Sequence, residues 1–273
     1  MAHIKKPQKI VVINDCRDDN ARVRLTTRLA ALFPKMNIEF VGVNSHIEAA
    51  GNLVDVLDAA LGKSALVLVN VAPRNGNHRW KNGSPFGYVQ VGNSHIFSTI
   101  EGYTLSLLAR VVEPFTVRVF DTDETVRWFG LHLWQQQIIA ASQFRSFDFL
   151  PLLASGVLAG RRLPSTPLES TEIPPLKSSV IWWQDNFGNL KTTIAAGDMN
   201  LCSGEYVKLC LGDGSVIPSY YYEHLSDIPV HKFALTTGSS GYGAIRWLEI
   251  IKKGGRACDE LGVGSGMVIT IEK

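Results

Sequence analysis

Two hydrophobic periods alternate along the first half of the chain. Residues 9–14 (KIVVIN) and 65–71 (ALVLVNV) are continuous, β-rich apolar runs, typical of strands buried in a parallel sheet. A third strand-like run lies at 37–43, and apolar residues at helical spacing occupy 21–33 and 47–61. Because strands that alternate with helices form layered α/β structures, this order predicts a mostly parallel sheet with helices on both faces.

The same alternation continues to residue 162. Residues 72–87 are rich in Pro, Gly and Asn, which predicts a long loop. Further strands are expected at 87–91, 94–98 and 115–120, and further helices at 101–110, 124–141 and 146–160. The sequence therefore predicts an N-terminal α/β domain over residues 1–162.

A proline-rich segment separates this domain from a different second part. Four of residues 163–176 are proline, so we expect neither helix nor central strand there and assign residues 163–177 to a linker. Residues 178–273 are predicted to form a smaller β-barrel domain, because short strand-like runs alternate with Gly, Asp and Asn turns. These runs lie at 179–184, 191–194, 206–211, 215–217, 231–235 and 267–271.

Composition excludes several classes of protein. The 273 residues include 27 Lys and Arg against 25 Asp and Glu, a balance that disfavours a dedicated nucleic-acid binder. No apolar run approaches the roughly 18 residues of a membrane-spanning helix. The four cysteines are widely spaced and form no CxxC pair, which indicates neither a disulfide framework nor a metal site. We expect a cytoplasmic protein with no metal, no nucleic-acid partner and no membrane contact.

The most distinctive motif is DNFGN, which runs from Asp185 to Asn189 between two strand-like segments. Its carboxylate, aromatic ring and amide offer a ligand a hydrogen-bond acceptor, a stacking surface and a group that both donates and accepts. The alternative is an ordinary β-turn in which the aspartate bonds to its own backbone. The residues alone leave both interpretations open.

A second motif is GSSG, in which Ser239 and Ser240 lie between two glycines. Consecutive backbone N–H groups and two hydroxyls suit a carboxylate or another anion. The alternative is a flexible surface loop.

A third candidate is Asp15, which follows the first predicted strand. Ligands of open α/β sheets lie beyond the carboxyl ends of the strands, where an aspartate can accept hydrogen bonds from a ribose diol. No GxGxxG follows this strand, which argues against a standard dinucleotide-binding fold. The alternatives for Asp15 are a helix N-cap and a plain loop carboxylate.

In this order the motifs resemble a known family, the S-adenosylmethionine (SAM) hydroxide adenosyltransferases and their relatives, the SAM-dependent chlorinases and fluorinases. The resemblance covers nearly the whole chain and rests on IVVINDCRDDN, FVGVNSHIEAAGNLVDVLDAAL, VNVAPRNGNHR, SQFRSFDFLPLLASGVLAG, DNFGN, and GSSG with WLEI and GGRA. It implies a parallel-sheet N-terminal domain, a C-terminal β-barrel and a homotrimer that binds SAM between subunits.

The activity implied by the resemblance is hydrolysis of SAM to adenosine and L-methionine, in which water or hydroxide attacks C5′. SAM is the substrate, and no separate cofactor is implied. Six residues at matching positions would contact this nucleoside: Asp15 (ribose hydroxyls), Asp185 (methionine ammonium), Asn189 and Phe187 (adenine), and Ser239 or Ser240 (methionine carboxylate).

The residues that would activate the water depart from the family pattern. Ala72 stands where the hydroxide-using branch has Asp, Arg79 is retained, and Arg145 replaces a His. Arg79 is therefore expected to position the water, with His78 or Arg145 as further candidates. Because an Arg pair can also bind chloride, a halogenase remains an alternative, as does a nucleoside-binding homologue without activity. An unrelated α/β hydrolase is disfavoured because the sequence has no GxSxG.

Overall fold

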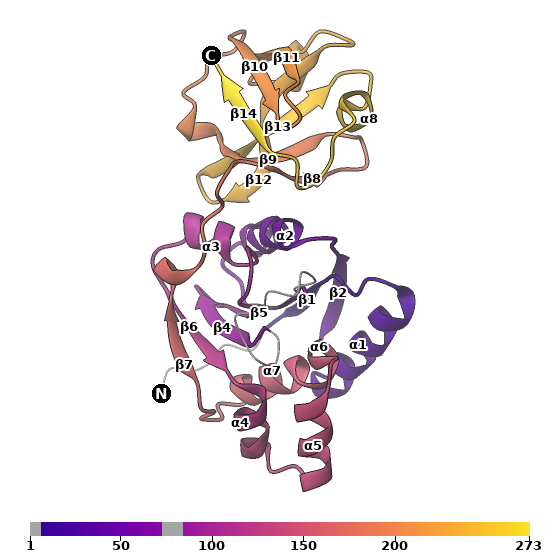
Figure 1. The fold of residues 1–273 in the computed structure, drawn as a ribbon, viewed down its shortest axis with the longest axis vertical. Helices are drawn as coiled ribbons and strands as arrows, with labels where there is room; N and C mark the ends of the chain where they lie inside the picture. The colour runs from indigo at the N-terminus through magenta and orange to yellow at the C-terminus, as the bar shows by residue number, and fades with distance from the viewer. Residues whose placement is uncertain (1–6, 73–83) are drawn as a thin grey trace. The chain divides into compact units, whose positions relative to one another are not determined.

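The chain divides into two compact units, Met1–Pro175 and Leu176–Lys273 (Figure 1). The computed structural model describes residues 7–72 and 84–273. The division falls inside the predicted linker 163–177, but that linker is too long. Part of it is a strand, β7 (Thr166–Glu169), which pairs with the sheet of the first unit. A proline is tolerated there because β7 lies at the edge of the sheet.

The first unit is built on a seven-stranded sheet of order β2-β1-β3-β5-β4-β6-β7. Besides β7, its strands are β1 (Lys9–Asn14), β2 (Asn37–Gly42), β3 (Ala65–Asn70), β4 (Phe86–Val91), β5 (Ser94–Thr99) and β6 (Thr116–Phe120). The neighbours β2, β1, β3 and β5 pair in parallel, whereas β4, β6 and β7 join by antiparallel pairing.

The sheet is therefore mixed, although five of its seven strands run in the same direction. The predicted direction is right for β2, β1, β3, β5 and β6, and wrong for β4 and β7, which run the opposite way. Only Gly92 and Asn93 connect β4 to β5, and a two-residue connection joins antiparallel strands. Gly92 adopts a φ of +55°, which suits a tight turn of this kind.

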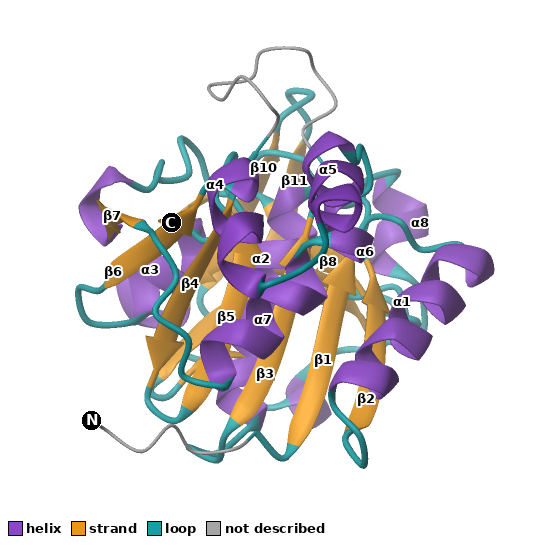
Figure 2. Cartoon of the chain, turned by 90° about the horizontal axis from the view of Figure 1, so that it is seen from below, coloured by secondary structure: helices purple, strands orange, loops and turns teal. Residues whose placement is uncertain are grey.

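Helices cover both faces of this sheet. They are α1 (Asp19–Leu32), α2 (His46–Ala59), α3 (Ser106–Val111), α4 (Thr122–Val126), α5 (Leu133–Ala141), α6 (Arg145–Asp148) and α7 (Leu150–Leu158), with short 3-10 turns η1 (Arg127–Phe129) and η2 (Ser170–Glu172). Figures 1 and 2 show the strands between α2 and α3 on one side and α1, α6 and α7 on the other. Leu29 of α1 and Leu153 of α7 pack with Ile10 and Leu66 of the strands in one buried cluster.

The single helix predicted over residues 124–141 is wrong. Gly130 takes a left-handed φ of +67° and ends η1, so the segment breaks into α4, η1 and α5. Glycine adopts this conformation without the steric cost that other residues meet. The predicted helix at 101–110 is likewise shorter and begins only at Ser106.

The second unit is a curled seven-stranded sheet of order β14-β10-β11-β12-β13-β9-β8. Its strands are β8 (Ile181–Gln184), β9 (Leu190–Ala195), β10 (Tyr206–Leu211), β11 (Val216–Tyr221), β12 (Phe233–Tyr242), β13 (Ile245–Lys252) and β14 (Ile269–Glu272), with helix α8 (Ala257–Leu261) and 3-10 turns η3 (Ala196–Asp198) and η4 (Leu225–Asp227). Next to the two edge strands, Val180 and Val268 form a β-bridge, so the edges of the sheet meet.

Two expectations for this unit are wrong. The predicted strands omit β13, and the GSSG motif is not a loop but the end of β12. Gly241 pairs with Arg246 of β13, and a β-bulge between Thr237 and Gly241 accommodates the motif. The glycines of GSSG therefore lie in a strand that β13 approaches closely, and glycine is common at such positions in sheets.

None of the helices in the described part of the chain is long and apolar enough to cross a membrane.

Candidate functional site

The DNFGN motif is the turn between β8 and β9, and Asp185 organises it. Oδ1 of Asp185 accepts hydrogen bonds from the backbone N–H groups of Phe187 and Asn189, each at 2.9 Å. Oδ2 accepts from Nδ2 of Asn189, also at 2.9 Å. Gly188 closes the turn with a φ of +83°. The self-bonded turn that the sequence left open as one interpretation is therefore present.

This turn still has capacity to bind a ligand. A carboxylate oxygen accepts about two hydrogen bonds, and among the described residues Oδ2 of Asp185 receives only the one from Asn189. The amide of Asn189 keeps its oxygen and a second hydrogen for another partner. Phe187 is 68% exposed, so its ring is open to a stacking partner. The turn thus presents an acceptor, an amide and an aromatic face together.

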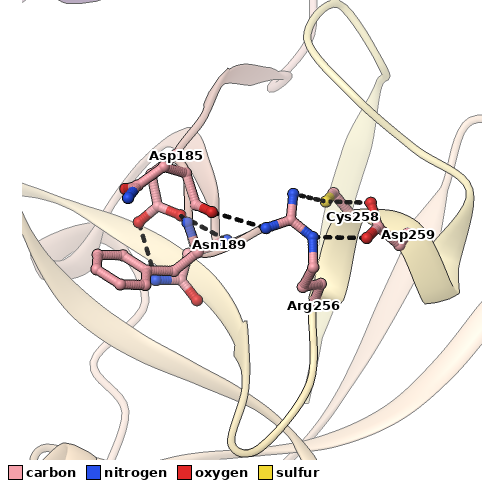
Figure 3. A network of polar contacts seen from close by, with 7 residues as sticks. Asp185, Asn189, Arg256, Cys258 and Asp259 are labelled. Atoms are coloured by element: carbon pink, nitrogen blue, oxygen red, sulfur yellow. Dashed lines mark hydrogen bonds and ion pairs between the residues drawn. The ribbon is translucent and has the colours of Figure 1, made fainter.

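The GGRA segment braces this turn, because its residues form hydrogen bonds with the backbone of the turn (Figure 3). Nη1 of Arg256 donates to the carbonyl oxygen of Asn186 at 2.7 Å. The backbone N–H of Cys258 donates to the carbonyl oxygen of Gly188 at 3.0 Å. Nε of Arg256 donates to Asp259 at 2.6 Å. A Cβ at Gly188 would lie 2.7 Å from Cβ of Arg256, so only glycine fits this close approach.

The Cys258 thiol belongs to the same brace. Burial raises its pKa, and its Sγ donates to Oδ1 of Asp259 at 3.0 Å. That hydrogen bond, followed by the one from Arg256, lowers the pKa of Asp259. Because a raised pKa favours the protonated thiol, Cys258 can donate this hydrogen bond to Asp259.

The two serines of GSSG lie in different surroundings, because successive strand residues point to opposite faces. Ser240 is buried, and its Oγ accepts from Nζ of Lys191 at 2.6 Å. Ser239 is exposed, and its carbonyl oxygen accepts from Nη1 of Arg246 at 3.1 Å. Ser239 is therefore the serine whose hydroxyl a ligand can reach. The Lys191–Ser240 contact connects this motif to the strand that leaves the DNFGN turn.

In the first unit, Asp15 lies at the carboxyl end of β1, as predicted from the sequence. Its Oδ2 accepts from the backbone N–H of Ala72 at 3.0 Å, and its Oδ1 accepts from Nδ2 of Asn70 at 3.3 Å. The N-cap of α1 is Asp18, so the N-cap alternative for Asp15 is wrong. Two donors at and just after the end of β3 thus orient this carboxylate. It lies at the carboxyl ends of the strands, where α/β proteins bind ligands.

Sequence reasoning missed His46, which begins α2 beside this edge. Its Nδ1 lies 3.2 Å from Oγ1 of Thr104, and a Cβ at Gly102 would lie 2.6 Å from the same nitrogen. Burial lowers the pKa of His46, whereas the negative charges of Asp15 and Glu101 act in the opposite direction. The only signal in the sequence was a histidine three residues after the predicted strand 37–43.

We expect His46 to make stability depend on pH. The folded protein holds the pKa of His46 below its ordinary value of 6.5, so between these two values the unfolded chain binds more protons. The contribution of His46 to stability is complete above pH 6.5 and falls as the pH drops toward the folded-state pKa. The melting temperature of His46→Asn, measured from pH 7 to pH 5, should fall less steeply than that of the wild type.

Asparagine at position 46 can keep the hydrogen bond to Thr104 but does not titrate. His224→Asn, at an exposed position of the second unit, controls for the loss of one histidine. A slope in His46→Asn equal to that of the wild type would contradict the assignment.

The residues expected to position water are only partly described. Arg145 is the first residue of α6, where burial lowers its pKa and the charges of Asp121 and Asp123 raise it. His78 and Arg79 lie outside the described residues. Within residues 7–72 and 84–273, no three His, Cys, Asp or Glu side chains group as metal ligands.

No protein-family model matches the sequence, and no curated protein matches it either. Among solved structures, the chain is similar to an uncharacterized conserved protein from Thermotoga maritima, with 15% identity and a TM-score of 0.68 over 96% of this chain and 100% of that one. A conserved hypothetical protein from Thermus thermophilus has 17% identity and a TM-score of 0.61 over 97% and 100%. At these identities the likeness shows a shared fold and says nothing of activity.

Proposed function

We propose that the protein binds SAM and hydrolyses it to adenosine and L-methionine. The observation that carries this proposal is the DNFGN turn, which is held by hydrogen bonds yet leaves groups for a ligand. Oδ2 of Asp185 can accept the methionine ammonium, the amide of Asn189 can pair with the adenine edge, and Phe187 can cover the adenine face. The exposed Ser239, beside Arg246, suits the methionine carboxylate.

The first unit supplies the second group of contacts in this proposal. Asp15 would accept hydrogen bonds from the ribose hydroxyls, since Asn70 and Ala72 already fix its carboxylate. Following the family resemblance, we propose that the curled sheet of the second unit is the family's β-barrel. The protein would then assemble as a homotrimer, with each SAM bound between subunits.

The proposed reaction is an in-line displacement. An oxygen of water attacks C5′ while the C5′–S bond breaks, its electron pair returns to sulfur, and one proton is released. Because the sulfonium leaves as neutral methionine, no group needs to protonate it, and the protein contributes alignment and removal of solvent. Arg79 would position the water. His46, whose lowered pKa favours a neutral imidazole at neutral pH, adds a proton acceptor near Asp15.

Binding without turnover is the second candidate, and two observations favour it. Ala72 provides only its backbone N–H, which Asp15 accepts, where the related enzymes have an aspartate. Arg145 stands where the related enzymes have a histidine. Both features remove members of the water-activating group and leave the proposed ligand contacts in place.

The decisive experiment combines product analysis with calorimetry. Purified protein is incubated with SAM, with and without chloride, and the mixture is analysed for adenosine, 5′-chloro-5′-deoxyadenosine and methionine. We expect adenosine above the level without protein, and at least a tenfold loss of SAM affinity in Asp15→Ala, because hydrogen bonds to charged groups contribute about 1.5–3 kcal/mol. Arg79→Ala should lower turnover more than binding.

The other outcomes separate the alternatives. Tight binding without product would favour the inactive homologue, and a chlorinated product that forms only with chloride would identify a halogenase. Absence of both binding and product would overturn the proposal.

A further inference from the structure

The outward face of α5 has the composition of a buried surface. Its exposed positions follow helical spacing and are Leu133, Trp134, Gln137, Ile138 and Ala141. Leu133 is 76% exposed, Trp134 60% and Ile138 57%, and no residue of the helix is buried. Figures 1 and 2 show α5 on the outside of the first unit. An apolar stripe on one side of a helix normally faces a core, so this stripe requires a cover.

The composition around the stripe indicates which kind of partner can cover it. Residues 131–144 contain no Asp, Glu, Lys or Arg. A helix that lies on a membrane surface carries Lys and Arg on its polar face, whereas α5 carries glutamines. A strongly charged protein partner could form no ion pair with residues 131–144. The face is suited to an equally uncharged, apolar surface.

The order of residues in α5 makes the face complementary to itself. In an antiparallel pair centred on Gln137, the large Leu133 comes opposite the small side chain of the partner's Ala141. Two Gln137 amides then meet on the axis, and each can both donate and accept a hydrogen bond. A twofold contact has this property, because each patch must fit its own copy.

We propose that a second copy of this chain covers α5 through a twofold, antiparallel α5–α5 contact. The exposed area fits a modest interface. The large side chains of the face, Leu133, Trp134 and Ile138, expose about 400 Å² per chain, at about 150–250 Å² per large side chain. A standard interface uses about 800 Å² per partner, and polar side chains at the rim supply the remainder. The contact does not depend on the proposed function.

The test is the mass of the full-length protein in solution, by light scattering and sedimentation equilibrium. We expect an even number of chains: two, or six if the proposed trimer also forms. Trp134→Glu combined with Ile138→Glu should halve that mass, because pairing would bury four carboxylates without partners. Val23→Glu, at a 57% exposed position of α1, is the matched control and should leave the mass unchanged.

A cross-linking variant tests the geometry itself. Gln137→Cys should give a disulfide-linked pair under mild oxidation, whereas Val23→Cys and the wild type, with its four native thiols, should not. Circular dichroism of each variant checks that the fold is retained. A monomeric or trimeric wild type, a mass unchanged by the double substitution, or binding of α5 to anionic phosphatidylserine vesicles in place of a second copy would each overturn the proposal.

Discussion

Gly241→Ala should destabilise the second unit by about 3 kcal/mol or more. Gly241 has a φ of +138°, a conformation that residues with a Cβ rarely adopt. An added Cβ would overlap the carbonyl oxygen of Ile245 and lie 3.0 Å from Cα of Arg246. Since both atoms are backbone of the paired strand β13, no side-chain movement relieves the overlap. Urea unfolding followed by tryptophan fluorescence measures the loss.

Gly243→Ala is the matched control for this substitution. It lies in the same β12–β13 hairpin and has a φ of +57°, but no atom lies within 4 Å of an added Cβ. We expect a cost of only about 1–2 kcal/mol, from the left-handed conformation alone. Equal losses in the two variants would show that backbone conformation, and not the close approach of β13, makes glycine necessary at position 241.

Asp185→Asn should reduce SAM affinity by about ten- to a hundredfold, because hydrogen bonds to charged groups contribute about 1.5–3 kcal/mol. Asparagine retains an oxygen that can accept from the backbone N–H groups of Phe187 and Asn189, so the turn should persist. The carboxylate oxygen proposed to receive the ligand's ammonium is lost. Calorimetric titration with SAM measures the affinity, and urea unfolding measures the stability.

Asp213→Asn supplies the comparison for that loss. Asp213 makes the same kind of turn between β10 and β11, where its Oδ1 accepts from the backbone N–H of Ser215 at 2.9 Å. No ligand role is proposed for that turn, so SAM affinity should be unchanged. If both variants bound SAM as the wild type does, Asp185 would be a turn residue only, and the proposed ammonium contact would be wrong.

The parts of the fold that depend on local pattern could be predicted from the sequence. Continuous apolar runs located β1 and β3, because a strand buried on both faces needs apolar residues at every position. The strand β13 was overlooked although its sequence, IRWLEIIK, is rich in β-branched and aromatic residues. Its Trp-Leu-Glu-Ile segment was considered only as a family motif. Pairing in the β4–β5 hairpin followed from a two-residue connection that the α/β pattern obscured.

In the candidate site too, interactions between residues close in sequence could be predicted and those between distant residues could not. Asp185 could be selected because its partners lie within four residues along the chain. The contact of Arg256 with Asn186 spans 70 residues, and no local pattern encodes such a contact. His46 was missed for a similar reason, because its surroundings come from Thr104 and Gly102, more than 50 residues away.

The meeting of β8 and β14 through Val180 and Val268 bears on how this protein resists aggregation. An open sheet edge offers unpaired backbone groups as a template for strands of other molecules. In the second unit, the segments next to the two edge strands pair with each other at this bridge. In the first unit, Pro167 removes a backbone donor from the edge strand β7. Addition of further strands is thus opposed in two different ways. Backbone pairing opposes it at β8 and β14, and a proline opposes it at β7.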